Sequence, residues 1–438
     1  MPSLDRQWAV PQPERNAYHA SMADHRDPVD PMIESVNAQA RDLLDDTIAM
    51  RRRIHEWPEL GNELPMTRDV VLESLEGLPL SVTTHESTSG VVALLEGSKP
   101  GPTMLLRGDM DALPMPEDTG VDFSSHVDGC MHACGHDTHT AMLSSAAHLL
   151  SGRRDDIAGR VLFMFQPGEE GHHGARFMLD EGLLDVPNLS DGSASAVDAA
   201  FALHITSALP SGWVSGRGGP IMASADMMSI RITGRGGHAS EPHRALDPIP
   251  VACEIVTALQ TMITRSIDVF DPSVVTVGRI AAGTTNNVIP EVAEIEGTIR
   301  ATSERTRAKV HDGIRRVAEG VAAAHGCECS VEVTFGYPVT VNDDQFAEFA
   351  LDMATDVAGA DHVVRLPHPV MGAEDFSYLL EKVPGAMSLL GVCPDHIENS
   401  LEAPACHSNK MMLHEPAMAN GMAIHAATAL AALEELRG

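Results

Sequence analysis

Short apolar runs recur along the chain and are separated by polar or helical stretches. We expect buried strands where these runs lie, at 90–95, 103–106, 160–165, 200–205 and 386–391. Residues 31–57 instead carry apolar side chains at helical spacing, which predicts an amphipathic helix. Apolar runs that alternate with helices such as 138–151 are typical of buried parallel strands. The pattern therefore predicts an α/β fold, with a mixed, largely parallel sheet and helices on both faces.

Residues 218–336 follow another pattern. The expected order is βαββαβ, with strands at 226–233, 273–280, 293–300 and 330–335 and helices at 247–266 and 304–325. This order is that of a ferredoxin-like α+β sandwich. We predict an inserted domain at 218–336 and a catalytic domain made of 32–217 and 337–438. The polar residues 1–31 are expected to form a flexible N-terminal arm.

The composition and net charge of the chain exclude some classes of binding partner. The chain has 438 residues, of which 43% are hydrophobic and 21% charged, as is usual for globular proteins. Its 30 basic and 62 acidic residues give a net charge of −32. Nucleic acid and anionic membranes are therefore not expected as partners, because both attract positive patches. Seven cysteines without a disulfide-scaffold spacing, and no visible signal peptide or membrane span, lead us to expect a cytoplasmic protein.

Carboxylates and imidazoles gather where the predicted strands end. Asp109, Glu169, Glu170 and His204 each come at or just after the end of an apolar run. Open α/β sheets place their functional sites at the carboxyl ends of strands. Separate segments of the chain are thus expected to bring chemically active side chains to one edge of the sheet.

A thiol and further imidazoles complete a candidate metal site. The expected ligands are Cys134, His136, Glu170, His204 and His407. These ligand types suit Zn²⁺, Mn²⁺, Co²⁺ or Ni²⁺, and a carboxylate or thiolate can bridge two ions. We therefore expect a divalent transition metal, with two ions per subunit. Glu169, held beside Glu170, is expected to take the proton of an activated water and deliver it to a leaving amine.

Each of these residues also has a simpler interpretation. A single buried cysteine or histidine is usually a packed core residue. A pair of glutamates at a strand end often only interacts with the dipole of the next helix. The combination favours the metal site, because the simpler interpretation must place several unrelated polar groups at matching positions by chance.

Ten motifs, in order from about residue 35 to the C-terminus, make the chain similar to a known family. They lie at 52–60, 106–114, 131–137, 166–170, 202–204, 234–240, 285–290, 297–300, 372–376 and 406–409. With them the chain resembles the aminoacylase and carboxypeptidase family of di-metal hydrolases. The branch it resembles contains hippurate hydrolase and the indole-3-acetyl-amino-acid hydrolases.

The resemblance implies roles for the site residues. It makes the five candidate ligands the metal ligands and Glu169 the general acid/base. Relatives outside the branch have a His-x-Asp metal motif where this chain has Arg107-Gly108-Asp109. Asp109 is then expected to orient His136 or another ligand without binding the metal itself. A plain strand-end cap is an equal alternative for Asp109.

The resemblance also implies a homodimer, formed through the inserted domain. His238 matches the family histidine that reaches into the neighbouring subunit's site and stabilises the oxyanion. Asn287 and Arg300 match the pair that binds the free carboxylate of the substrate. The simpler alternatives are a turn histidine for His238 and a strand-face salt bridge for Arg300.

These observations together predict a metal-dependent amidohydrolase. It would cleave N-acyl-L-amino acids to a carboxylic acid and a free amino acid. The nearest alternative is a dipeptidase or carboxypeptidase with the same di-metal site, in which Glu374 or Asp375 binds the free amine of the substrate. A less favoured alternative is a metal-binding descendant without turnover, against which the presence of Glu169 argues. Hinges for closure of the inserted domain are expected near 216–219 and 336–338.

Overall fold

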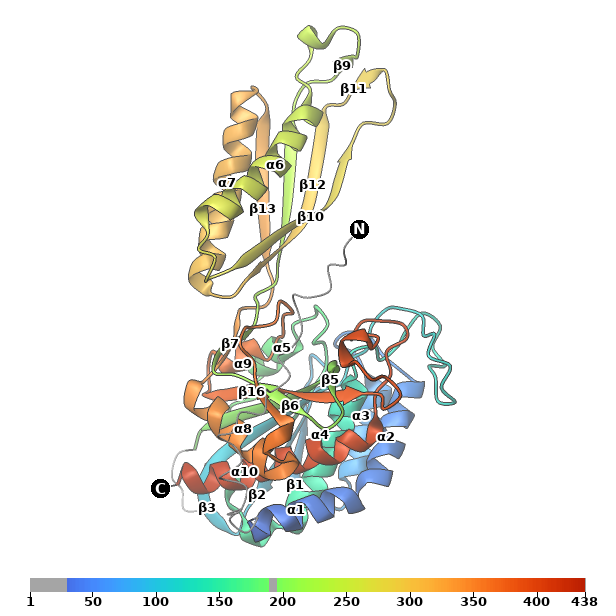
Figure 1. Ribbon diagram of the computed structural model, residues 1–438, viewed down its shortest axis with the longest axis vertical. Coiled ribbons are helices and arrows are strands. Elements are labelled where there is room, and N and C mark those ends of the chain that lie inside the picture. The colour runs from blue at the N-terminus through green and yellow to red at the C-terminus, as the bar shows by residue number, and fades with distance from the viewer. Residues whose placement is uncertain (1–29, 189–194, 438) are drawn as a thin grey trace, which may run out of the picture.

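The computed structural model describes residues 30–188 and 195–437 (Figure 1). The predicted N-terminal arm, residues 1–31, lies almost wholly outside these described residues, so its structure stays a prediction. Among the helices of the described residues, none is long and apolar enough to cross a membrane.

A mixed eight-stranded sheet forms the larger unit, as predicted. Its strand order is β1-β2-β4-β3-β5-β16-β6-β15. The strands are β1 (Leu80–Thr84), β2 (Val91–Glu96), β3 (Lys99–Asp109), β4 (Ala158–Gln166), β5 (Ala199–Pro210), β6 (Val214–Gly216), β15 (Val363–Arg365) and β16 (Gly385–Cys393). The central strands β4, β3, β5 and β16 are parallel, whereas β1 and β2 add an antiparallel edge. The predicted fold class is confirmed.

Helices cover both faces of this sheet. One face carries α1 (Pro31–Asp42), α2 (Leu44–Glu56), α3 (Pro65–Leu75), α4 (His136–Gly152), α8 (Asp344–Ala358) and α10 (Met418–Glu435). The other face carries the short helices α5 (Gly174–Asp180) and α9 (Ser377–Leu380). Neighbouring side chains of β3 alternate between the two cores, since Leu105 packs in one and Leu106 in the other. Burial on both faces explains why these strands are continuous apolar runs rather than alternating ones.

The single helix expected at 31–57 is instead two consecutive helices. The chain turns at Leu43, which lies between α1 and α2. Asp45 and Asp46 occupy the first turn of α2, where carboxylates stabilise a helix N-terminus. The apolar periodicity runs through both helices, so it could not reveal the break.

The insert forms a separate antiparallel sheet of strand order β10-β12-β8-β13. Its elements follow the predicted βαββαβ order: β8 (Asp226–Thr233), α6 (Pro248–Ser266), β10 (Ser273–Ala282), β12 (Val292–Ala301), α7 (Glu304–Ala324) and β13 (Glu328–Phe335). Buried and exposed residues alternate along β8, because α6 and α7 cover only one face of the sheet (Figure 1). A small ribbon of β9 (Gly237–His238) and β11 (Val288–Ile289) lies at the end of the insert farthest from the larger sheet.

Two chain segments join the insert to the larger unit (Figure 1). They pair as the antiparallel strands β7 (Gly219–Met222) and β14 (Thr340–Asn342). Both predicted hinge segments, 216–219 and 336–338, lie beside this ribbon. The exact limits of the inserted domain, and its movement, stay predictions.

Candidate metal centre and active site

Residues from three consecutive segments meet at the carboxyl edge of the central strands. Asp109 is the last residue of β3, and Glu169 and Glu170 follow the end of β4. Cys134 and His136 lie at the N-terminus of α4, the helix between β3 and β4. The topology thus places the site where open α/β sheets usually carry theirs.

A sharp turn at Gly135 presents the first two of these side chains. Gly135 has a φ of 79°, and a Cβ added there would lie 2.7 Å from Ile205 Cγ1. A larger residue would therefore be strained and would collide with β5. His204 lies inside β5, which continues to Pro210, rather than at the end of its strand as the sequence suggested.

The structure brings all five predicted metal ligands into one cluster. Cys134 Sγ lies 3.4 Å from His204 Nε2, and His407 Nε2 lies 3.1 Å from Glu170 Oε1. Three overlapping groups have their ligand atoms within 4.8 Å of one another: Cys134, His136 and His204; Cys134, Glu170 and His407; and His136, Glu169 and Glu170. The segments that contribute them are far apart in the sequence, so this proximity comes from the tertiary fold.

The donor set fits a divalent transition metal. His136 Nε2 is buried and has no hydrogen-bond partner among the described residues, which is costly unless a cation meets it. Burial opposes a charge on His136, yet the carboxylates of Asp109, Asp111 and Glu170 raise its pKa to about 10. The cluster therefore favours positive charge at this point. Thiolate, imidazole and carboxylate ligands together suit ions such as Zn²⁺.

Glu169 lies beside this cluster in a buried, acidic environment. Only 6% of its surface is exposed. Burial raises the pKa of its carboxyl group, and the nearby charges of Glu374, Glu170 and Asp375 raise this pKa further. A carboxylate whose pKa is raised accepts a proton more readily than an ordinary glutamate. Its environment therefore suits a general acid/base.

Asp111 holds the two glutamates and connects them to His136. Its Oδ1 and Oδ2 atoms accept hydrogen bonds from the backbone N–H groups of Glu169 and Glu170, each at 2.9 Å. Asp111 Oδ1 also lies 3.3 Å from His136 Nδ1. The sequence analysis predicted no role for Asp111.

Asp109 has a different set of contacts. Its Oδ2 atom lies 3.6 Å from His136 Nε2, and Arg107 Nη1 donates to the same oxygen at 2.6 Å. Its Oδ1 atom lies 2.5 Å from His139 Nδ1. Asp109 thus lies near His136, while the carboxylate that is hydrogen-bonded to His136 Nδ1 is Asp111.

His139 is a buried histidine of the site that sequence reasoning missed. Its Nε2 accepts a hydrogen bond from the backbone N–H of Ile205 at 2.8 Å, so Nδ1 carries the proton that is donated to Asp109. Burial lowers its pKa to about 4, against the effect of Asp109. The sequence could have revealed His139 by its spacing, because it lies three residues after His136 in α4. Residues at this spacing share one face of a helix.

A buried arginine neutralises the carboxylates below the site. Arg107 Nη2 donates to Glu374 Oε1 at 2.6 Å and lies 3.3 Å from Asp375 Oδ1, while Nη1 binds Asp109. Its Nε donates to Gln166 Oε1 at 2.8 Å. Arg107 is therefore held by three carboxylates.

The residues expected to act across a dimer lie away from this cluster. His238 and Asn287 come together at the far end of the insert, because His238 pairs with Val288 in the β9–β11 ribbon. The side chain of His238 is exposed, with Nδ1 2.8 Å from Ser240 Oγ. Arg300 lies on β12, partly buried. Within the described part of the chain, no hydrogen bond or ion pair joins these three residues to the metal-ligand cluster.

The sequence of this chain is similar to those of known hydrolases. Residues 105–431 match the model of peptidase family M20/M25/M40. Thermostable carboxypeptidase 1 of Saccharolobus solfataricus is 37% identical over 91% of this chain and 98% of its own length. IAA-amino acid hydrolase ILR1-like 4 of Arabidopsis thaliana is 36% identical over 91% of this chain and 88% of its own. N-acetylcysteine deacetylase of Bacillus subtilis is 39% identical over 78% of this chain and 87% of its own.

A solved structure extends the similarity to the fold. The Bacillus subtilis protein YxeP, described as a dinuclear metal-binding peptidase of the M20 family, is 34% identical, with a TM-score of 0.76. The match covers 90% of this chain and 99% of YxeP. The chain therefore belongs to peptidase family M20/M25/M40, in the amidohydrolase branch with the IAA-amino acid hydrolases, and is a metal-dependent hydrolase of that family.

Proposed function

We propose that this protein is a cytoplasmic, homodimeric amidohydrolase that cleaves N-acyl-L-amino acids to a carboxylic acid and a free amino acid. The observation that carries the proposal is the position of Glu169. It is a buried carboxylate with a raised pKa, within 4.8 Å of the ligand atoms of His136 and Glu170. Metal binding alone needs no such proton acceptor, whereas hydrolysis does.

Two buried contacts favour an amidase over a dipeptidase. A free amine on the substrate needs an acidic partner, and Glu374 and Asp375 are the candidates. Glu374 is paired with Arg107, and Asp375 accepts hydrogen bonds from Gln166 Nε2 at 2.6 Å and from the backbone N–H of Ala175 at 2.9 Å. Both are almost fully buried, so neither is available to an ammonium group. The similar IAA-amino acid hydrolase and N-acetylcysteine deacetylase also carry names of enzymes that act on acylated amino acids.

In the proposed reaction the cluster ligands hold one or two divalent ions. When bound, such ions act as Lewis acids and lower the pKa of water to about 7. Glu169 accepts the proton of the attacking water and passes it to the nitrogen that leaves. His238 of the second subunit donates a hydrogen bond to the oxyanion. Arg300 and Asn287 bind the free carboxylate of the substrate. A substrate whose carboxylate is blocked should therefore be cleaved poorly.

A substrate panel tests the proposal. Purified protein loaded with Mn²⁺, Zn²⁺, Co²⁺ or Ni²⁺ is incubated with N-acetyl and N-benzoyl amino acids and with unblocked dipeptides, and free amino acid is measured. We expect release from the acylated substrates, lost on chelation and restored by metal. Turnover confined to the dipeptides would make the protein a peptidase. No turnover of either class by the loaded protein would contradict the proposal.

Substituting Glu169→Gln separates proton transfer from metal binding. Because the amide keeps the shape of the side chain but cannot accept a proton, kcat should fall about 10²- to 10⁴-fold. Metal content, measured by mass spectrometry of the purified protein, should not change. The matched variant Glu170→Gln removes a proposed ligand and should lower metal content as well. Wild-type turnover by Glu169→Gln would rule out the assigned role.

Mixed dimers test the sharing of residues between subunits. Glu169→Gln and His238→Ala chains should each be inactive alone. When they are refolded or co-expressed together in equal amounts, about one quarter of wild-type activity should return, because half of the dimers then hold one intact site. A mixture as inactive as its parents would show that His238 does not serve the partner's site.

A further inference from the structure

One tyrosine connects the base of the insert to the catalytic loop. Tyr337 follows the last strand of the insert, β13, and precedes the ribbon strand β14. Its side chain is buried, with 7% of its surface exposed. Its hydroxyl donates a hydrogen bond to the backbone oxygen of Glu169 at 2.5 Å. The contact joins residues 168 positions apart in the sequence.

The peptide unit between Glu169 and Glu170 is thereby held from two sides. Its C=O accepts from Tyr337, and its N–H donates to Asp111 Oδ2. Asp111 belongs to the end of the central strand β3, whereas Tyr337 belongs to the connection with the insert. Rotation of this one peptide would move both the proposed acid/base and a proposed metal ligand.

The backbone on the insert side of Tyr337 is firmly held. Gly336 N–H donates to Asp226 Oδ1 at 3.0 Å, and Tyr337 C=O accepts from Ala225 N–H at 3.0 Å. Asp226 is buried and binds Arg307 through both oxygens, at 2.9 and 2.6 Å. Arg307 Nη2 also reaches the Gly336 carbonyl at 3.4 Å. The backbone of Tyr337 must therefore follow any movement of the insert's base.

The loop side of the contact is packed around the same ring. The imidazole of His173 lies edge-on to Tyr337, with ring centroids 4.9 Å apart, and its Nδ1 lies 2.9 Å from the hydroxyl of Tyr378. His173 has a φ of 58°, a left-handed conformation that a non-glycine residue adopts only when its surroundings hold it. Burial raises the pKa of Tyr337, and Asp375 and Glu169 raise it further, so its hydroxyl stays a donor.

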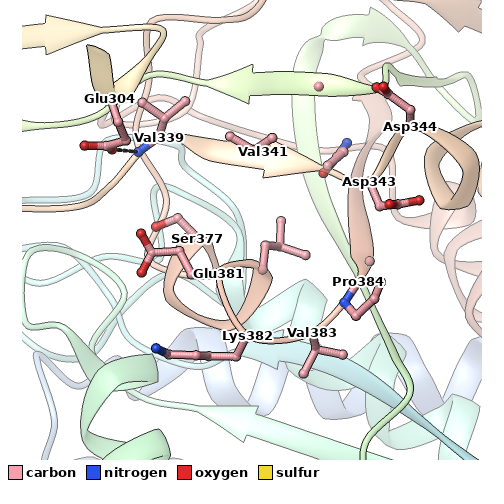
Figure 2. A pocket seen from close by; sticks show the side chains of 14 residues that line it. Glu304, Val339, Val341, Asp343, Asp344, Ser377, Glu381, Lys382, Val383 and Pro384 are labelled. Carbon is pink, nitrogen blue, oxygen red and sulfur yellow. Dashed lines mark hydrogen bonds between the residues drawn. The ribbon is translucent and has the colours of Figure 1, made fainter. Parts of the chain in front are cut away.

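The insert's base also borders an open space beside this point. A cavity of about 640 Å³ lies next to the ribbon, and its lining includes Glu304 of the insert and Glu381 and Lys382 after α9 (Figure 2). At one edge of the cavity, Glu304 accepts a hydrogen bond from the backbone N–H of Val339 at 3.0 Å, drawn as a dashed line. On the side of α9, the hydroxyl of Tyr378 also reaches the insert's base, since it lies 3.4 Å from the Gly336 carbonyl oxygen. Tyr337 is the tyrosine of this link whose hydroxyl binds the Glu169 carbonyl.

We propose that Tyr337 is a positioning residue that transmits the orientation of the insert to the Glu169–Glu170 peptide. This inference rests on the proposed roles of the two glutamates. The insert also carries His238, Asn287 and Arg300. In the proposed dimer these three residues serve the partner's site, so an orientation of the insert that completes that site also sets the Glu169–Glu170 peptide of the insert's own subunit. Catalytic competence is thereby coupled to the insert's position through the Tyr337 hydroxyl.

The first test measures metal affinity and needs no substrate. Tyr337→Phe removes only the hydroxyl and keeps the ring against His173. Because the same peptide carries Glu170, Zn²⁺ affinity by chelator competition should fall about 10-fold, a typical effect of losing a group that supports a metal ligand. The control Tyr378→Phe removes a hydroxyl from the same aromatic cluster without touching the Glu169 carbonyl. It should keep its affinity within about twofold. Unchanged affinity in Tyr337→Phe, or an equal loss in both variants, would overturn the proposal.

The second test uses turnover at saturating metal. Tyr337→Phe should lower kcat about 10- to 100-fold with little change in KM, because the acid/base is misplaced while the substrate contacts remain. Arg307→Lys loosens the anchor next to Gly336 and should lower kcat in the wild-type background. It should lower kcat no further once Tyr337→Phe is present. Losses that multiply in the double variant would contradict coupling through Tyr337. An inactive wild-type protein would refute the proposed function, and the metal-affinity test would still decide the inference.

Discussion

The buried guanidinium of Arg107 is the interaction on which the site depends. It lies under the carboxyl edge of the sheet and binds Asp109, Glu374 and Asp375 at 2.6 to 3.3 Å. An ionised carboxylate buried without a partner is very unfavourable, so these groups could not share this space without the arginine. Replacing Arg107 would take the cationic partner from the buried carboxylates of Asp109 and Glu374 at once.

The arginine does not balance all of the negative charge. Glu169, Glu170 and Asp111 lie above it, and the pKa values of Glu169 and His136 are both raised in this acidic environment. A bound divalent cation would supply the missing positive charge and would displace the proton from His136, since an imidazole ligand must be neutral. The protein thus has a framework of fixed carboxylates in which a metal and a proton acceptor can lie side by side.

Much of the fold and of the ligand cluster could be predicted from sequence, because both depend on local pattern. Apolar runs revealed the parallel strands, and Glu170 was found because parallel strands end at a common edge. His204 was expected at a strand end for the same reason, but it lies inside β5. Contacts that depend on packing between distant segments could not be predicted. Arg107 and Glu374 are 267 residues apart, and neither the link from Asp111 to the glutamates nor the contact of Tyr337 with Glu169 leaves a periodic signal. The turn at Leu43 was missed because helical periodicity continues across it.

X-ray absorption at the zinc edge of the Zn²⁺-loaded protein tests the central claim most directly. The clustered side chains are expected to bind the metal, and Cys134 is the sulfur donor among them. The spectrum should therefore contain a sulfur shell at about 2.3 Å beside nitrogen and oxygen ligands. This shell should disappear in Cys134→Ser, while the lighter ligands remain. Zinc bound to the wild-type protein with nitrogen and oxygen ligands alone would contradict the account, because the metal would then lie outside the cluster.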